Sequence, residues 1–177
     1  MSDINHDNYS DDYIRAILQD SKTIAMVGAS ARTSRPSYFV LKYLLQKGFT
    51  VIPVNPREAG TDILGQKTYA SLADVPVGID MVDIFRNSQA ADAITDEAIA
   101  INAKVVWMQL SVRNDQAAHR AQAAGLKVVM NRCPKIEYGR LSGEINWMGV
   151  NSRTLSSKKP QLTGTRVQSF GLGRPKT

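Results

Sequence analysis

The fold is decided by the stretch Ile24-Ala25-Met26-Val27-Gly28-Ala29-Ser30-Ala31-Arg32-Thr33-Ser34-Arg35-Pro36. An apolar run predicts a strand, small residues follow as a turn, and the closing proline suits the first turn of a helix, where a missing N–H costs nothing. The unpaired N–H groups and the dipole of a helix N-terminus stabilise an anion by about 0.3 to 1 kcal/mol. The stretch therefore predicts a strand, a tight turn and a helix whose first turn faces a phosphate group.

Five residues of this turn are candidates for holding the phosphate: Gly28, Ala29, Ser30, Arg32 and Arg35. The small residues let a ligand approach the backbone, and each arginine would add a charge-assisted hydrogen bond of about 1.5 to 3 kcal/mol. The later glycines of the dinucleotide fingerprint are absent, so the turn alone does not indicate NAD. A tight turn with two solvated arginines is the alternative interpretation.

Strand and helix signals alternate from residue 10 to residue 141. Short runs rich in Val, Ile, Met and Phe are nearly continuous, which is typical of parallel strands covered on both faces. These runs are residues 23–27, 50–54, 81–85, 105–108 and 127–130, and helical segments separate most of them. The alternation predicts an α/β, Rossmann-like, doubly wound parallel sheet of about five strands, in the order 3-2-1-4-5, flanked by helices.

The residues after the second and third strands differ from those of an NAD-binding domain. Such a domain places Asp or Glu near the end of its second strand to accept from the ribose 2′-hydroxyl, whereas this chain has Asn55, Pro56 and Arg57. A phosphorylated ribose, as in NADP or coenzyme A (CoA), fits these residues better. Phe85 and Arg86 end the third strand, and a core aromatic beside a solvated base is their alternative interpretation.

Ligands of doubly wound sheets bind at the carboxyl ends of the strands, where the winding direction changes. The order 3-2-1-4-5 puts this point beside the first and fourth strands, and the fourth strand ends at Met108 and Gln109. We therefore expect the ends of the first four strands to share one rim, which contributes cations and hydrogen-bond donors and no carboxylate.

Several classes of site are disfavoured by composition. The nucleophile elbow, the zinc-protease helix and the P-loop are all absent, so no catalytic residue is assigned. His6 and His119 are too few and too far apart to suggest a metal cluster, and one cysteine permits no internal disulfide. Cys133 stands between Arg132 and Lys135, a setting that would lower a thiol pKa, although a packed core position is the favoured interpretation.

The net charge of +6 arises at the C-terminal end. Residues 151–177 hold six basic and no acidic residues, which leaves 16 basic and 16 acidic residues in the rest of the chain. We expect residues 1–150 to form the ordered domain and residues 151–177 a mobile basic tail. Such a tail would hold nucleic acid or an acidic partner, but Phe170 is its only aromatic residue, which favours a solvated extension. No leader or membrane span is evident, so we expect a soluble, cytoplasmic protein.

A succession of motifs resembles one family. It comprises Met26-Val27-Gly28-Ala29-Ser30, the run VIPVNP at residues 51–56, Ile63-Leu64-Gly65, Val82-Asp83-Ile84-Phe85-Arg86, Val106-Trp107-Met108-Gln109 and Arg132-Cys133-Pro134. The chain resembles the small bacterial CoA-binding proteins of the YccU type from about residue 11 to residue 141. These proteins in turn look like the N-terminal CoA-binding domain of the succinyl-CoA synthetase alpha subunit.

The resemblance implies a Rossmann-like domain that holds CoA at the first loop and the following strand ends. In that reading Gly28, Ala29 and Ser30 face the pyrophosphate, Arg57 stands where the synthetase domain has a nucleotide-contacting lysine, and Asn55 and Pro56 lie beside it. Phe85 and Arg86 then line the adenine side, and Met108 and Gln109 the far wall. Ser111 replaces the glycine usual in the small family, and the synthetase's second domain, which carries its phosphorylated histidine, has no counterpart, so ligase chemistry is not transferred.

Three functional hypotheses follow. The leading one is a protein that binds CoA or an acyl-CoA without catalysis of its own, and it includes a mixed disulfide between Cys133 and the CoA thiol as a narrower possibility. The second is an NADP-dependent oxidoreductase. This hypothesis is disfavoured because the sequence places no candidate acid or base beside the pocket. The third is a nucleic-acid-binding or partner-binding module that acts through the basic tail.

Overall fold

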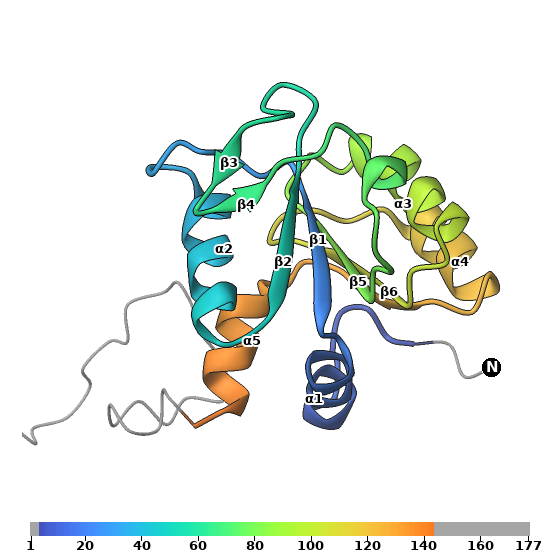
Figure 1. Ribbon diagram of the computed structural model, residues 1–177. Helices are drawn as coiled ribbons and strands as arrows, with labels where there is room; N and C mark the ends of the chain where they lie inside the picture. Colours follow the sequence, from blue (N-terminus) through green and yellow to red (C-terminus); the bar gives the residue numbers. More distant parts are fainter. Residues whose placement is uncertain (1–3, 144–177) are drawn as a thin grey trace, which may run out of the picture.

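A parallel sheet of five strands runs through the middle of the molecule (Figure 1). The computed structural model describes residues 4–143, so the basic tail lies outside the described residues. From one edge to the other, the strands are β2 (Thr50–Val54), β1 (Thr23–Val27), β5 (Met81–Ile84), β6 (Val105–Met108) and β7 (Lys127–Val129). The predicted α/β, Rossmann-like class with a doubly wound parallel sheet is confirmed.

The predicted strand order is wrong in one respect. The third strand of this sheet along the chain, β5, lies between β1 and β6 instead of outside β2, so the order is 2-1-3-4-5. All four residues of β5 are buried, as expected of a central strand. β2 contains Pro53, which has no N–H to donate to a neighbouring strand, so β2 suits the edge of the sheet. The winding direction therefore changes between β1 and β5, and the ends of these two strands are neighbours.

Helices cover both faces of the sheet (Figure 1). They are α1 (Asp11–Asp20), α2 (Pro36–Gln46), α3 (Ala90–Ala100), α4 (Asp115–Ala123) and α5 (Pro134–Leu141). Along β1, Ile24 and Met26 pack with α2 and α5, whereas Ala25 packs with α3 and α4 on the other face. Two buried faces explain why the strands are continuously apolar. None of the helices formed by residues 4–143 is long and apolar enough to cross a membrane.

The segment between β2 and β5 is irregular: its first part lies beside β2, and its later part packs against α3. It contains a two-stranded antiparallel ribbon, β3 (Asp62–Ile63) with β4 (Gln66–Lys67), and a single 3-10 turn, η1 (Leu72–Asp74). Tyr69 forms a parallel bridge to Val54, and its N–H donates to Pro53 O at 3.0 Å. Tyr69, which follows the ribbon, thus pairs with the edge of the sheet at Pro53.

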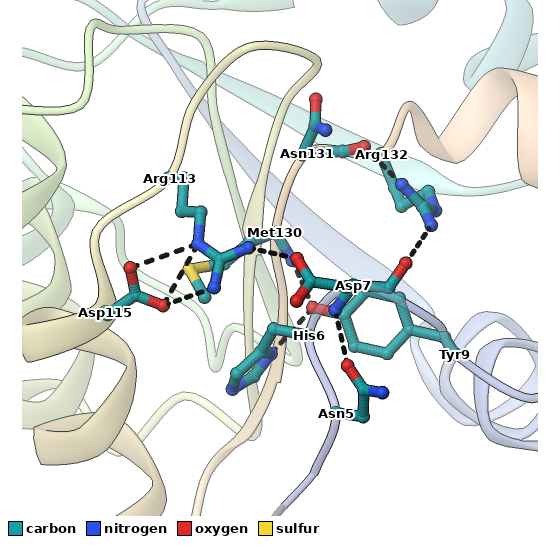
Figure 2. Close-up of polar contacts among 9 residues, drawn as sticks. All are labelled: Asn5, His6, Asp7, Tyr9, Arg113, Asp115, Met130, Asn131 and Arg132. Atoms are coloured by element: carbon teal, nitrogen blue, oxygen red, sulfur yellow. Dashed lines mark hydrogen bonds and ion pairs between the residues drawn. The ribbon is translucent and has the colours of Figure 1, made fainter.

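The opposite edge, β7, is closed by the residues before α1 and by the first turn of α1. We call Asn5–Tyr9 the N-terminal strap, and Figure 2 shows its contacts. The Tyr9 hydroxyl accepts from the Met130 N–H at 2.8 Å, and burial raises the pKa of Tyr9 to about 12, so this hydroxyl stays protonated. The Tyr13 hydroxyl both donates to Val128 O and accepts from Val128 N, each at 3.2 Å. Two tyrosines therefore satisfy backbone groups that a further strand would otherwise pair with.

Candidate functional site

A cavity of about 640 Å³ opens at the carboxyl ends of β1, β2 and β5. The structure brings eight of the predicted site residues to its wall: Gly28, Ser30, Arg32, Arg35, Asn55, Arg57, Phe85 and Arg86. Pro36, Ser37, Glu58 and Asn87 complete the lining. We call this site the cationic cleft.

Gly28 sets the distance between β1 and β5 at the floor of the cleft. Its φ is +88°, and a Cβ added there would lie 2.8 Å from Phe85 O and 2.9 Å from Arg86 Cδ. Its N–H donates to Val54 O at 2.8 Å, which ties the same residue to the end of β2. Only glycine fits this position, because any side chain would strain the backbone and collide with the end of β5. The sequence predicts Gly28 as a residue that lets a ligand come close to the backbone; the structure shows that it also lets β1 and β5 lie close together.

The N-terminus of α2 faces the cleft, as the sequence predicts. Pro36 is the first residue of the helix, and Arg35 occupies the N-cap position without a side-chain hydrogen bond to the first turn. Ser37, in that turn, lines the cavity and is 4% exposed. Because the side chain at the N-cap position makes no hydrogen bond to this helix, its first turn remains available to an anion. Ser37 was missed because a serine inside a predicted helix gives no separate signal.

The arginines of the cleft differ from the other arginines of residues 4–143. The five others are Arg15, Arg113, Arg120, Arg132 and Arg140, and each forms an ion pair with at least one carboxylate. The four in the cleft, Arg32, Arg35, Arg57 and Arg86, form none within the described part of the chain, and all four are exposed. Like charges gathered without counter-charges repel one another, so this arrangement favours a polyanionic ligand.

Asn55 and Glu58 connect the turn after β2 to the turn after β1. The Asn55 amide donates to Ala29 O at 2.7 Å, and its Oδ1 accepts from the Arg57 N–H at 3.0 Å. The Glu58 carboxylate accepts from the Ser30 hydroxyl at 3.1 Å and from the Ala31 N–H at 2.7 Å. The expectation of a rim without a carboxylate is therefore wrong. Glu58 lies four residues beyond the end of β2, where the turn folds back toward the first loop, and the sequence pattern did not show that fold.

Four predicted site residues do not line the cavity. Pro56 is exposed on the turn, whereas Ala29 and Met108 are fully buried in the core. Gln109 is 6% exposed, and its amide donates to both carboxylate oxygens of Asp83, at 3.0 and 3.2 Å. Because β5 separates β1 from β6, the end of β6 stands one strand further from the cleft than the predicted order placed it. The structure gives Met108 and Gln109 roles in the core and does not bring them to a far wall.

Two further titratable groups lie behind the cleft. Burial raises the pKa of Asp83 to about 8, because the carboxylate has lost its hydration and the neutral Gln109 amide replaces little of it. Burial also raises the pKa of the Cys133 thiol, which is 6% exposed at the N-cap of α5. The favoured interpretation of Cys133 as a packed core residue agrees with this burial, and the alternative of a lowered thiol pKa is wrong, because desolvation outweighs the charge of Lys135. Among residues 4–143, no group of three His, Cys, Asp or Glu side chains is placed to hold a metal ion.

Comparison with known proteins gives the family. Residues 22–139 match a family model described as a CoA binding domain. The chain belongs to this family. It is 36% identical over 125 residues to the uncharacterized protein YneT of Bacillus subtilis, which covers 71% of this chain and 91% of that protein. The solved structure of a hypothetical protein from Pyrococcus horikoshii is 41% identical, with a TM-score of 0.73, and the match covers 81% of this chain and 100% of that one.

A larger relative shows where else this CoA binding domain occurs. The alpha subunit of the ADP-forming acetate–CoA ligase I of Pyrococcus furiosus is 29% identical over 93 residues, which is 50% of this chain and 20% of that subunit. The predicted resemblance to small CoA-binding proteins and to the domain of such ligases is therefore confirmed. This chain spans about a fifth of the ligase subunit, so the activity of the whole ligase is not assigned to it.

Proposed function

We propose that the protein binds CoA, or an acyl-CoA, in the cationic cleft. The observation that carries the proposal is the group of four arginines, without ion pairs among residues 4–143, that lines the cavity at the first turn of α2, in a chain of the CoA binding domain family. CoA carries a pyrophosphate and a ribose 3′-phosphate, so it brings several negative charges with which four guanidinium groups can pair.

The parts of the cleft suit different parts of this ligand. The pyrophosphate is assigned to Ser30, Arg32, Arg35 and the N-terminus of α2, where backbone N–H groups and the helix dipole favour an anion. The 3′-phosphate is assigned to Arg57, and the adenine to the side formed by Phe85 and Arg86. Phe85 is half-buried and follows β5 directly, so its ring can contact a base without leaving the core.

A binding role is favoured over catalysis by the lining of the cleft. It includes no histidine and no cysteine, and its one carboxylate, Glu58, is engaged with the first loop. The buried free thiol of Cys133 argues against ready disulfide exchange with CoA, because a thiol with a raised pKa is a poor nucleophile. We also propose that the protein is cytoplasmic and that the CoA-binding domain ends near residue 150.

Calorimetric titration of the full-length protein tests the proposal. We expect CoA to bind, and 3′-dephospho-CoA to bind about tenfold to 100-fold more weakly, because one phosphate with a charge-assisted hydrogen bond is lost. Absence of binding at millimolar CoA would contradict the proposal. Equal or tighter binding of NADP in competition would favour the oxidoreductase alternative.

A second titration separates the cleft from the tail. Deletion of residues 151–177 leaves CoA affinity unchanged if the cleft is the binding site. Loss of CoA binding on this deletion would move the site to the tail and support the third hypothesis.

A further inference from the structure

Glu58 is engaged in the cleft in a way that the proposed function does not explain. Four arginines with no ion pair in the described part of the chain line the same cavity, yet the Glu58 carboxylate pairs with none of them. It accepts instead from the Ala31 N–H at 2.7 Å and from the Ser30 hydroxyl at 3.1 Å. These are donors of the loop between β1 and α2, the loop that the proposed function assigns to phosphate.

The backbone of Glu58 is held while its side chain reaches across. Its N–H donates to Asn55 O at 3.1 Å, and its carbonyl accepts from the Thr61 hydroxyl at 2.7 Å and from the Thr61 N–H at 3.1 Å. The neighbouring Asn55 amide fastens the same turn to Ala29 O. The turn therefore stays in place when the carboxylate leaves, because Asn55 and not Glu58 joins the two loops through a buried contact.

We propose that Glu58 is an internal anion that occupies the phosphate loop until a phosphate group of the ligand displaces its carboxylate, an inference that rests on the proposed function. A carboxylate and a phosphate are both anions that accept from N–H and O–H donors, so they compete for Ala31 and Ser30. A bound phosphate beside the remaining carboxylate would also meet like-charge repulsion.

Displacement lowers the affinity of every ligand that uses the loop by one common factor, the fraction of molecules in which the loop is free. Free phosphate and other small anions make few further contacts, so this factor leaves them weakly bound. A ligand with adenine, ribose and a second phosphate retains enough binding energy from the rest of the cleft. Glu58 would thus select large phosphate-bearing ligands over free anions.

The test compares Glu58→Gln with Asp62→Asn. Glutamine keeps the size of the side chain and removes its charge. Asp62 is an exposed carboxylate of the same segment that does not line the cavity, so its variant controls for a change of charge alone. Each full-length protein is titrated with CoA, with inorganic pyrophosphate and with adenosine, which has no phosphate.

We expect Glu58→Gln to tighten the binding of CoA and of pyrophosphate by the same factor of about ten, equivalent to 1.4 kcal/mol, and to leave adenosine unchanged. Asp62→Asn should leave all three unchanged. Weaker or unchanged binding of CoA and pyrophosphate to Glu58→Gln would overturn the inference, since that is the result expected if Glu58 only braces the loop. Equal tightening by Asp62→Asn would overturn it too.

A spectroscopic readout keeps the inference separate from the proposed function. In the wild-type protein, pyrophosphate should shift the amide signal of Ala31 in a nitrogen–proton correlation spectrum, because its hydrogen-bond partner changes from carboxylate to phosphate. Binding of pyrophosphate with no change at Ala31 would overturn the inference. If CoA binds neither protein while pyrophosphate binds Glu58→Gln more tightly, the proposed function fails and the inference stands.

Discussion

The cationic cleft and the N-terminal strap both lie at the carboxyl ends of the strands, and both are built around arginines. In the cleft, Arg57 and Arg86 have no ion pair within the described residues. At the strap, Arg113 pairs with Asp7 and Asp115, and Arg132 donates to Asp7 O at 3.3 Å (Figure 2). The chain thus supplies the counter-charge at one end of the rim and leaves it to a ligand at the other.

This difference is the reason for proposing that the arginines of the cleft bind a ligand and that those at the strap stabilise the fold. An arginine whose donors are satisfied by its own chain contributes to the fold. In a group of arginines without carboxylate partners, the positive charges repel one another, and a bound anion would relieve this repulsion. Glu58 stands between the two cases, because it supplies a negative charge to the loop of the cleft and not to its arginines.

The largest effect is expected from the double variant Arg57→Ala/Arg86→Ala. It removes two charge-assisted hydrogen bonds to the ligand, each about 1.5 to 3 kcal/mol, so CoA affinity should fall by about 100-fold or more in a calorimetric titration. The urea midpoint should not fall, because neither side chain pairs with another described residue.

The matched control is Arg113→Ala at the strap. It should lower the urea midpoint slightly, since Asp7 and Asp115 lose their partner, and leave CoA affinity unchanged. If the two sets of variants affected affinity and stability alike, the contrast between binding and structural arginines would be lost.

The second prediction concerns pH and the carboxyl group buried beneath the cleft. Asp83 keeps its proton in the folded protein up to a pKa of about 8, whereas an unfolded chain releases it near pH 4. Between these values the folded state binds more protons, so this group lowers the free energy of unfolding by about 1.4 kcal/mol for each pH unit of increase. Asp83→Asn should remove that slope in urea titrations at pH 5, 6 and 7.

Asp62→Asn is the control for this measurement, because Asp62 is exposed. It should retain the slope of the wild-type protein. A wild-type stability that rose with pH as steeply as it is expected to fall, or an Asp83→Asn variant with the full slope, would contradict the assignment. The hydrogen bond from Arg113 lowers the pKa of Asp115, so that carboxylate contributes no fall of stability in this range.

The third prediction tests the close approach of strands on which the cleft depends. Gly28→Ala should lower the free energy of unfolding by about 2 to 3 kcal/mol, because its Cβ would meet Phe85 O and its backbone would be strained. CoA affinity should fall as well, since Phe85 and Arg86 must move. Gly48→Ala separates the two causes: Gly48 also has a positive φ, +87°, but a Cβ there meets nothing within 4 Å. It should lose only about 1 kcal/mol.

The sequence predicts those features that local patterns determine. The continuous apolar strands predicted the fold class, and the arginines that follow these strands predicted most of the lining of the cleft. The order of β5 depends on pairing between distant segments, although Pro53 in β2 was a local sign of an edge strand that the periodicity alone did not use. Glu58 and the strap were missed for a similar reason: the Tyr9 hydroxyl meets an N–H that is 121 positions away, and no local pattern encodes that contact.

The smallest effect is expected at the strap itself, from Tyr9→Phe. The variant leaves the Met130 N–H without its partner, so the free energy of unfolding should fall by about 1 kcal/mol in a urea titration. CoA affinity should not change, because the strap closes β7 and does not line the cleft. Tyr38→Phe, which removes a hydroxyl with no hydrogen bond among residues 4–143, should leave both quantities unchanged. A Tyr9→Phe protein that kept its stability and lost CoA affinity would instead make the strap part of the binding site, and the contrast between the two ends of the rim would fail.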